Sequence, residues 1–226
     1  MGNRAPFAVD EWYHCYNRGV DKRTTFESDY EYKRFIELLY LSNSDTPIRR
    51  SDQSTLSFAE VFTLPRSEPL VAIGAYCLMP NHFHLLLKDL SEEGGGISRF
   101  MQKLGTAYTM YFNMSRERTG NLFIKPFRSK HISSDEYLKR VTQYIHFNPI
   151  ELFEPGWKEG RLKSPDTLMT RLREYPYSSL ADFQPDSSRP EGTVVDKEMI
   201  EILQDETFDL QDTLSDMAEY YRELAK

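Results

Sequence analysis

Two apolar runs with a short break between them constrain the fold more than any other feature of this sequence. Residues 70–78 and 82–88 each have the length of one strand, and Met79-Pro80-Asn81 separates them. Apolar runs of this length around such a break predict a β-hairpin. Three consecutive leucines in the second run predict a strand covered on both faces, because both sides of its pleat are apolar. We therefore expect this hairpin in the middle of a sheet.

The segments around the hairpin predict a mixed succession of strands and helices. The aromatic run 12–17 reads as a strand, and apolar residues at helical spacing predict helices over 29–41 and 97–115. Ser28 and Glu31 have the spacing of a capping box at the start of the first helix. A short strand over 127–132 and a helix from about 135 to 148 complete the order.

The last of these helices has clear signals at both ends. Ser133 or Ser134 is suited to the N-cap, and Pro149 should end the helix, since it disfavours helical geometry in the residue before it. The order β-α-β-β-α-β is that of an α+β fold, the ferredoxin-like βαββαβ sandwich, which has an antiparallel-rich sheet with helices on one face. The helix ending near Asn148 is then an addition to this fold.

The length of 226 residues fits one domain with additions. We expect that domain over 1–185, with a polar surface insertion at 43–69 that has a little local structure around 58–62. Residues 186–226 should form an acidic, helical C-terminal extension. The two cysteines, Cys15 and Cys77, are expected as buried free thiols rather than as a disulfide framework.

The distribution of charge is more informative than the net charge of −7. Residues 186–226 have twelve acidic and four basic side chains, so residues 1–185 have a net charge of +1. Within 97–140, nine Lys and Arg face three acidic residues. This local excess can bind phosphates, although it is also compatible with ordinary solvated helix faces. No long apolar segment or secretory signal is apparent, so we expect a cytoplasmic protein that does not enter membranes.

His82 and His84 are the first candidates for chemistry. Residues i and i+2 of a strand point to the same face, so the two imidazoles should project together, while Phe83 points into the core. Two imidazoles on one face of a strand make half of a divalent-metal site. A chance pair of surface or core histidines is the alternative.

Tyr144 and Asn148 supply the other half. At i and i+4 of the predicted helix they share a face, one turn apart. The Asn148 amide oxygen can be a third metal ligand, and the Tyr144 phenol can be a covalent nucleophile. The alternative for Tyr144 is an aromatic residue that only packs. A structural zinc site would need a closed set of four Cys or His ligands, which this pattern lacks.

Four short motifs resemble those of a known family, the HUH single-tyrosine transposases, and most closely the REP-associated branch related to the insertion-sequence enzymes. A later stretch, Tyr175-Pro176-Tyr177-Ser178-Ser179, also resembles a family motif, and the resemblance covers roughly residues 10–183. The four motifs are Tyr13-His14-Cys15-Tyr16-Asn17-Arg18-Gly19, Met79-Pro80-Asn81-His82-Phe83-His84-Leu85-Leu86, Phe127-Arg128-Ser129-Lys130 and Tyr144-Ile145-His146-Phe147-Asn148-Pro149.

The resemblance implies a transposase with its catalytic domain over 1–185. It implies that His82, His84 and Asn148 bind Mg²⁺ or Mn²⁺ and that Tyr144 is the nucleophile. The implied substrate is a single-stranded DNA hairpin of the REP type. Cleavage by this family leaves a 5′-phosphotyrosine and a free 3′-OH, and a new 3′-OH can reverse the step, so no nucleotide cofactor is needed. The protein would act at the nucleoid.

Basic residues near these motifs are expected to contact phosphates. Arg128 and Lys130 alternate on one predicted strand, and Arg99 and Lys103 lie on the preceding helix. His14 could orient the nucleophile or the DNA, but a hydrogen-bonded structural role is the simpler expectation.

Two other functions remain open at this stage. A domesticated relative would bind hairpin DNA without cutting it, and a metal-dependent phosphodiesterase would use water and release a free 5′-phosphate. We expect a monomer, because the long segment after Asn148 differs from the shorter relatives that exchange the tyrosine helix in dimers.

Overall fold

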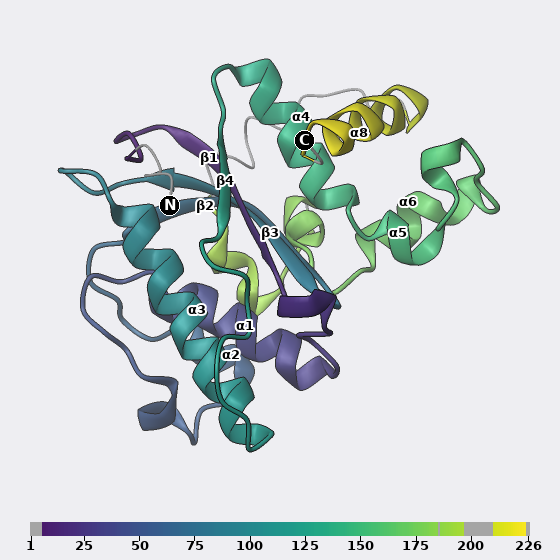
Figure 1. Cartoon of the computed structure of the whole chain (residues 1–226). Helices are drawn as coiled ribbons and strands as arrows, with labels where there is room; N and C mark the ends of the chain where they lie inside the picture. Colours follow the sequence, from purple (N-terminus) through teal and green to yellow (C-terminus); the bar gives the residue numbers. More distant parts are fainter. Residues whose placement is uncertain (1–5, 185, 197–209, 225–226) are drawn as a thin grey trace.

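The computed structural model describes residues 6–184, 186–196 and 210–224, and its centre is a four-stranded antiparallel sheet (Figure 1). The strand order β2-β3-β1-β4 places the first strand between the third and the fourth. This is the order of two interleaved split βαβ units, so the predicted α+β, ferredoxin-like fold is confirmed. The strands are β1 (Trp12–Arg18), β2 (Val71–Met79), β3 (His82–Asp89) and β4 (Arg128–His131).

Helices cover the sheet, and α1, α3 and α4 begin and end within one residue of the predicted limits. The main helices are α1 (Asp29–Ser42), α3 (Gly96–Ser115), α4 (Asp135–Phe147), α6 (Pro165–Arg173) and α8 (Leu210–Leu224), with the single turns α2 (Phe58–Val61) and α5 (Ile150–Phe153). Short 3₁₀ segments are η1 (Val20–Lys22), η2 (Arg50–Gln53), η3 (Trp157–Glu159), η4 (Ser179–Phe183) and η5 (Pro190–Val194). The helical extension predicted after residue 186 is seen as α8, while 197–209 lie outside the described residues.

The β2–β3 hairpin forms as expected and contributes two of the four strands. Met79 pairs with His82, so Pro80 and Asn81 make a two-residue turn. Every residue of β2 is buried. The hairpin is covered on both faces, because Leu85 and Leu87 belong to one apolar core while Leu86 belongs to another.

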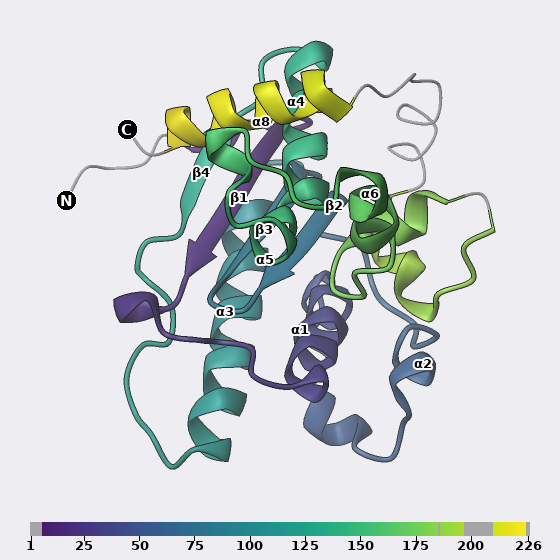
Figure 2. The same ribbon diagram turned by 90° about the vertical axis from the view of Figure 1, so that its right-hand side faces the viewer.

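The two helices of the predicted sandwich lie on one face of the sheet, as expected, and the added helices cover the other face. Helices α1 and α3 pack on one face of the sheet, and α4, α6 and α8 pack on the other (Figure 2). The apolar run in β3 explains the second layer of helices, since a strand with leucines on both sides of its pleat must be covered on both faces. The second layer of helices is what places α4 over the strand that carries the two histidines.

Local helix signals were correct for α4 but not for α1. The Ser134 hydroxyl accepts a hydrogen bond from the Tyr137 backbone N–H, as an N-cap should. Ser28 makes no such bond. The Glu31 carboxylate instead accepts from the Glu27 N–H and pairs with Arg116, which directly follows α3. The predicted capping box is therefore absent, because a tertiary ion pair takes the carboxylate.

The junction after α4 also differs from expectation. Asn148 keeps helical dihedrals (φ −51°, ψ −35°) although it precedes Pro149. Helix α5 begins directly after the proline, at Ile150. The chain therefore remains helical through Asn148. Asn148 stays one turn after Tyr144, on the same side of the helix.

The polar segment 43–69 is fastened to the domain at several points. The Asn43 side chain exchanges hydrogen bonds with the backbone of Leu70 and Val71 at the start of β2. Arg50 pairs with Glu37 of α1 at 2.9 Å, and the helical turn α2 lies where local structure was expected. These contacts hold the segment against α1 and the sheet edge.

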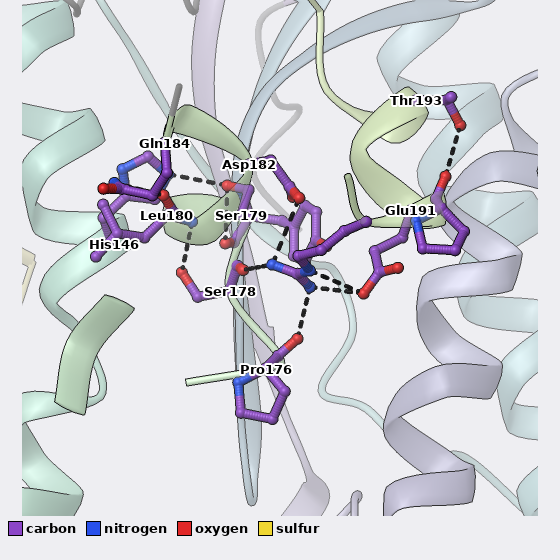
Figure 3. A network of polar contacts seen from close by, with 12 residues as sticks. His146, Pro176, Ser178, Ser179, Leu180, Asp182, Gln184, Glu191 and Thr193 are labelled. Carbon is purple, nitrogen blue, oxygen red and sulfur yellow. Dashed lines mark hydrogen bonds and ion pairs between the residues drawn. The ribbon is translucent and has the colours of Figure 1, made fainter. Parts of the chain in front are cut away.

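A network of polar contacts fixes α4 against β2 from behind (Figure 3). The Ser179 hydroxyl accepts a hydrogen bond from the Tyr76 N–H of β2 and lies 2.9 Å from the Nε2 of His146 in α4. Arg189 donates to the carbonyls of Pro176 and Ser178 and so holds the segment that carries Ser179. Sequence motifs 175–179 and 144–149 therefore contact each other through Ser179 and His146.

The acidic helix α8 packs against α4. Arg140 of α4 pairs with Glu219 at 2.9 Å, and Lys130 of β4 pairs with Glu223 at 2.5 Å. Cys15 and Cys77 are both buried free thiols, as expected. Within the described ranges, no helix has the length and hydropathy needed to cross a membrane.

Candidate active site

One cavity of about 480 Å³ collects all four residues expected to carry chemistry. His82 and His84 enter it from β3, and Tyr144 and Asn148 enter from the end of α4. The pleat of β3 turns both imidazoles toward α4, while Phe83 points into the core on the α1 and α3 side. The structure therefore brings together residues that lie about 60 positions apart.

His82 and Asn148 present two electron-rich atoms to each other. The Nδ1 of His82 lies 2.7 Å from the Asn81 side-chain oxygen, which can only accept, so Nδ1 holds the proton. The Nε2 of His82 then has a free lone pair, and it lies 3.1 Å from the Asn148 side-chain oxygen. Neighbouring donors on an octahedral Mg²⁺ are roughly 3 Å apart. Two facing acceptors at this distance fit a shared cation.

His84 is buried and turns one ring nitrogen away from the cavity. Its Nδ1 lies 2.8 Å from the Nε2 of His14, which leaves the His84 Nε2 for the cavity. Burial, with a smaller contribution from His14 and His82, holds the pKa of His84 well below its ordinary value. Burial likewise lowers the pKa of His82. Both imidazoles are therefore neutral near pH 7, which is the form that binds metal ions.

Tyr144 lies beside these ligands with 3% of its surface exposed. Its ring centroid is 5.3 Å from that of His84. Burial, followed by the carboxylate of Glu151, raises the pKa of Tyr144, while a hydrogen bond with Asn148 lowers it. The phenol is therefore protonated at neutral pH and must lose its proton as it attacks.

The donor set is two imidazoles and one amide. Considering only residues whose placement is described, no three His, Cys, Asp or Glu side chains are arranged to hold an ion. The ligands expected from the sequence are of another kind, because the third one is the amide oxygen of Asn148. Imidazole and oxygen donors together suit Mn²⁺, and the oxygen suits Mg²⁺.

The four basic residues expected to contact DNA are divided between two faces. Arg128 is exposed and lines the cavity. Lys130 lies on the same face of β4, but it is paired with Glu223 and its Nζ lies 5.2 Å from the centre of the Tyr220 ring. Arg99 and Lys103 belong to α3, which covers the opposite face of the sheet, and the Lys103 ammonium bonds the Ser44 carbonyl. The structure therefore keeps Arg128 and Lys130 near the candidate site and separates Arg99 and Lys103 from it.

Several residues of the cavity were not singled out from the sequence. Asn81 orients His82, and its position directly before the histidine was the available signal. Glu151 lines the cavity one turn beyond Asn148 and bonds Lys158. Tyr221 and Leu224 of α8 also line it, and no local pattern indicated that this distant helix would reach the site.

The chain was compared with known proteins and solved structures. The chain is similar to a REP-associated tyrosine transposase bound to a REP hairpin, with a TM-score of 0.49 and 14% sequence identity, over 80% of this chain and 83% of that one. No protein-family model matches the sequence. No curated protein matches it either.

Proposed function

We propose that this chain is a metal-dependent enzyme that cuts and rejoins single-stranded DNA, with Tyr144 as its nucleophile. The observation that carries the proposal is the convergence of Tyr144, Asn148 and the two β3 histidines on one cavity. The close approach of the His82 nitrogen to the Asn148 oxygen supports a cation at that point. Hairpins of the REP type are the proposed substrate, because the sequence motifs resemble those of enzymes that act on them.

The proposed step is an exchange of one phosphodiester for another. The Tyr144 oxygen attacks phosphorus, the bond from phosphorus to the 3′ oxygen breaks, and the phenolic proton is lost while the 3′ oxygen gains one. The DNA is then attached to Tyr144 through its 5′-phosphate, and a different 3′-OH can reverse the step. A bound Mg²⁺ or Mn²⁺ would polarise a phosphate oxygen and stabilise the charge that develops during transfer.

Several residues around the cavity would orient the metal ligands, contact the phosphate and exclude water during this step. Neutral His82 and His84 are available as ligands, and Asn81 and His14 fix the orientation of their rings. Arg128 is exposed at the cavity and would contact a phosphate next to the scissile bond. Burial of Tyr144 restricts the access of water, which would otherwise compete for phosphorus.

Labelled single-stranded oligonucleotides with hairpins from the vicinity of the gene, incubated with Mn²⁺ and analysed on a denaturing gel, test the proposal. The wild-type protein should retain label, and Tyr144→Phe should retain none while still binding the hairpin. Tyr108→Phe is the matched control, because its hydroxyl bonds the Thr25 carbonyl within the core on the far face. A labelled adduct in Tyr144→Phe would remove Tyr144 from the role.

A protein that binds hairpins without cutting them is the second candidate. Tyr221 and Leu224 of α8 line the cavity and Glu223 pairs with Lys130, so the acidic helix lies where DNA would enter. Hairpin binding that is independent of metal, with no cleavage of any sequence tested, would favour this function. Cleavage that releases a free 5′-phosphate with no adduct would favour hydrolysis by water.

We further propose that the protein acts as a monomer on DNA in the cytoplasm, at the nucleoid. Support for the monomer comes from the packing of α8 on α4, where the ring centroids of Tyr220 and Tyr144 are 4.7 Å apart, because this contact holds the tyrosine helix within its own fold. Light scattering that shows a stable dimer would overturn this part of the proposal.

A further inference from the structure

His14 links the candidate metal ligand His84 to the C-terminal helix. It belongs to β1, where its Cα partner across the ladder is Leu86, so its side chain projects on the same face as His84. Its Nε2 lies 2.8 Å from the Nδ1 of His84, and its Nδ1 lies 2.7 Å from the Tyr220 hydroxyl. His14 and Tyr220 are 0% exposed and His84 is 4% exposed. These contacts form a continuous chain of hydrogen bonds that is shielded from water.

The direction of this chain decides which nitrogen of His84 has the lone pair. A neutral imidazole holds one proton, so one of its nitrogens donates and the other accepts. When His84 donates from Nδ1 to His14, its Nε2 is free to bind a cation in the cavity. His14 then holds its own proton on Nδ1 and donates it to the Tyr220 oxygen. When the chain runs the other way, the Nε2 of His84 is protonated and cannot be a ligand.

We propose that His14 and Tyr220 are positioning residues that hold His84 in its metal-binding tautomer. The inference rests on the proposed function, since it requires His84 to be a ligand. A metal-bound histidine generally donates its second N–H to a fixed acceptor, which sets the ring orientation and raises its basicity. Here the acceptor is another imidazole, whose own proton is received by a tyrosine.

The series of hydrogen bonds from His84 through His14 to Tyr220 ends at a group that can accept a proton. Tyr137 lies next to Tyr220, with ring centroids 5.9 Å apart. The Tyr137 hydroxyl is buried. Burial raises the pKa of Tyr220, and a side-chain hydrogen bond between Tyr137 and Tyr220 contributes to the same rise, so Tyr137 is the next acceptor. Tyr220 can therefore accept from His14 and still direct its own hydroxyl proton to a partner.

The consequence is that α8 belongs to the metal site and does more than cover it. Tyr220 is separated from His14 by 206 positions, and its ring also packs on Tyr144 with centroids 4.7 Å apart. Removing the contact with α8 should therefore weaken metal binding even where all three ligands remain. A helix that only covered the cavity would have the opposite effect, because its removal would ease the entry of the ion.

Binding of Mn²⁺ to the full-length protein without DNA, measured by calorimetry, tests the inference. His14→Leu should lower the affinity roughly 10- to 100-fold, as loss of an outer-shell partner does. His14→Gln should recover much of it, because the amide oxygen can accept from the His84 N–H. Tyr220→Phe should lower the affinity by a smaller factor.

Two control variants make the same chemical changes elsewhere. His131→Leu removes an imidazole bonded to the Glu11 carboxylate, and Tyr108→Phe removes a buried hydroxyl bonded to a carbonyl. Both should bind Mn²⁺ like the wild type at matched thermal stability. His14→Leu or Tyr220→Phe with wild-type affinity would overturn the inference. A wild-type protein that binds no Mn²⁺ would instead defeat the proposed function.

The tautomer can also be observed directly. The chain has only five histidines, so ¹⁵N spectra of the imidazole rings are tractable. In the wild-type protein with Mg²⁺, His84 and His14 should both be protonated on Nδ1. This measurement needs no variant, so it remains possible if a substitution at either position prevents folding. A proton on the Nε2 of His84 in the metal-bound protein would refute the inference.

Discussion

Replacing Asp182 by asparagine should stabilise this protein at about pH 8, and much less at about pH 5. The Asp182 side chain is 2% exposed, and within the described part of the chain its two oxygens make no hydrogen bond. Its partner is Arg189, at 3.5 Å, which also pairs with Glu191 (Figure 3). Burial raises the pKa of Asp182 from 3.8 to about 7, against the opposing effect of Arg189.

The direction of the pH effect follows from proton binding. The folded protein holds this proton more tightly than the unfolded chain, so the free energy of unfolding decreases as the pH rises from about 4 to about 7. Above pH 7 the loss is complete and constant. A shift of about three pKa units corresponds to roughly 4 kcal/mol of destabilisation at pH 8, and to about 1–2 kcal/mol at pH 5. Asparagine has the shape of the protonated acid and avoids this cost.

Urea unfolding at the two pH values measures the effect. Asp182→Asn should gain about 2–4 kcal/mol at pH 8, and the gain should shrink by about half or more at pH 5. Asp186→Asn, an exposed position four residues away, is the control and should show no such dependence on pH. A variant that is less stable than the wild type at pH 8, or whose gain does not depend on pH, would show that Asp182 is held as a carboxylate by Arg189 and that the reasoning is wrong.

Three further predictions follow from individual contacts. Ser134→Ala should destabilise the protein by about 1 kcal/mol in thermal or urea unfolding, and Ser28→Ala, whose side chain caps nothing, by much less; equal losses would contradict the capping argument. Glu223→Gln should raise hairpin affinity and make it more sensitive to salt, because Lys130 is released to contact phosphate; unchanged binding in a filter or fluorescence assay would exclude Lys130 from the interface. Asn148→Ala should weaken Mn²⁺ binding in calorimetry while the protein still folds, and wild-type affinity would remove the amide from the ligand set.

The strands and helices around the site were predictable because their signals are local. The apolar runs and the turn at Pro80-Asn81 specified the hairpin, and its pleat placed His82 and His84 on one face. Helical spacing placed Tyr144 and Asn148 on one side of α4. These relations depend on residues within a few positions of each other, so they hold wherever the element packs.

Predictions that depended on distant partners were less successful. The spacing of Ser28 and Glu31 predicted a capping box, but Glu31 pairs with Arg116, which directly follows another helix, α3. Lys103 resembled a DNA contact but lies on the far face of the sheet, where its ammonium bonds Ser44. In both cases a charged side chain pairs with or bonds to a residue that is distant in the sequence, which no local pattern identifies.

The sequence by itself determined the order of the elements, the shared side of β3 on which His82 and His84 lie, and the shared side of the helix on which Tyr144 and Asn148 lie. Tertiary structure alone decided that α4 packs over β3, that His14 contacts His84, and that α8 returns to the site through Tyr220. The reason is physical. Backbone geometry repeats over two to four residues and is visible in the sequence, whereas burial of apolar surface selects which distant faces meet, and only then are hydrogen bonds across them possible.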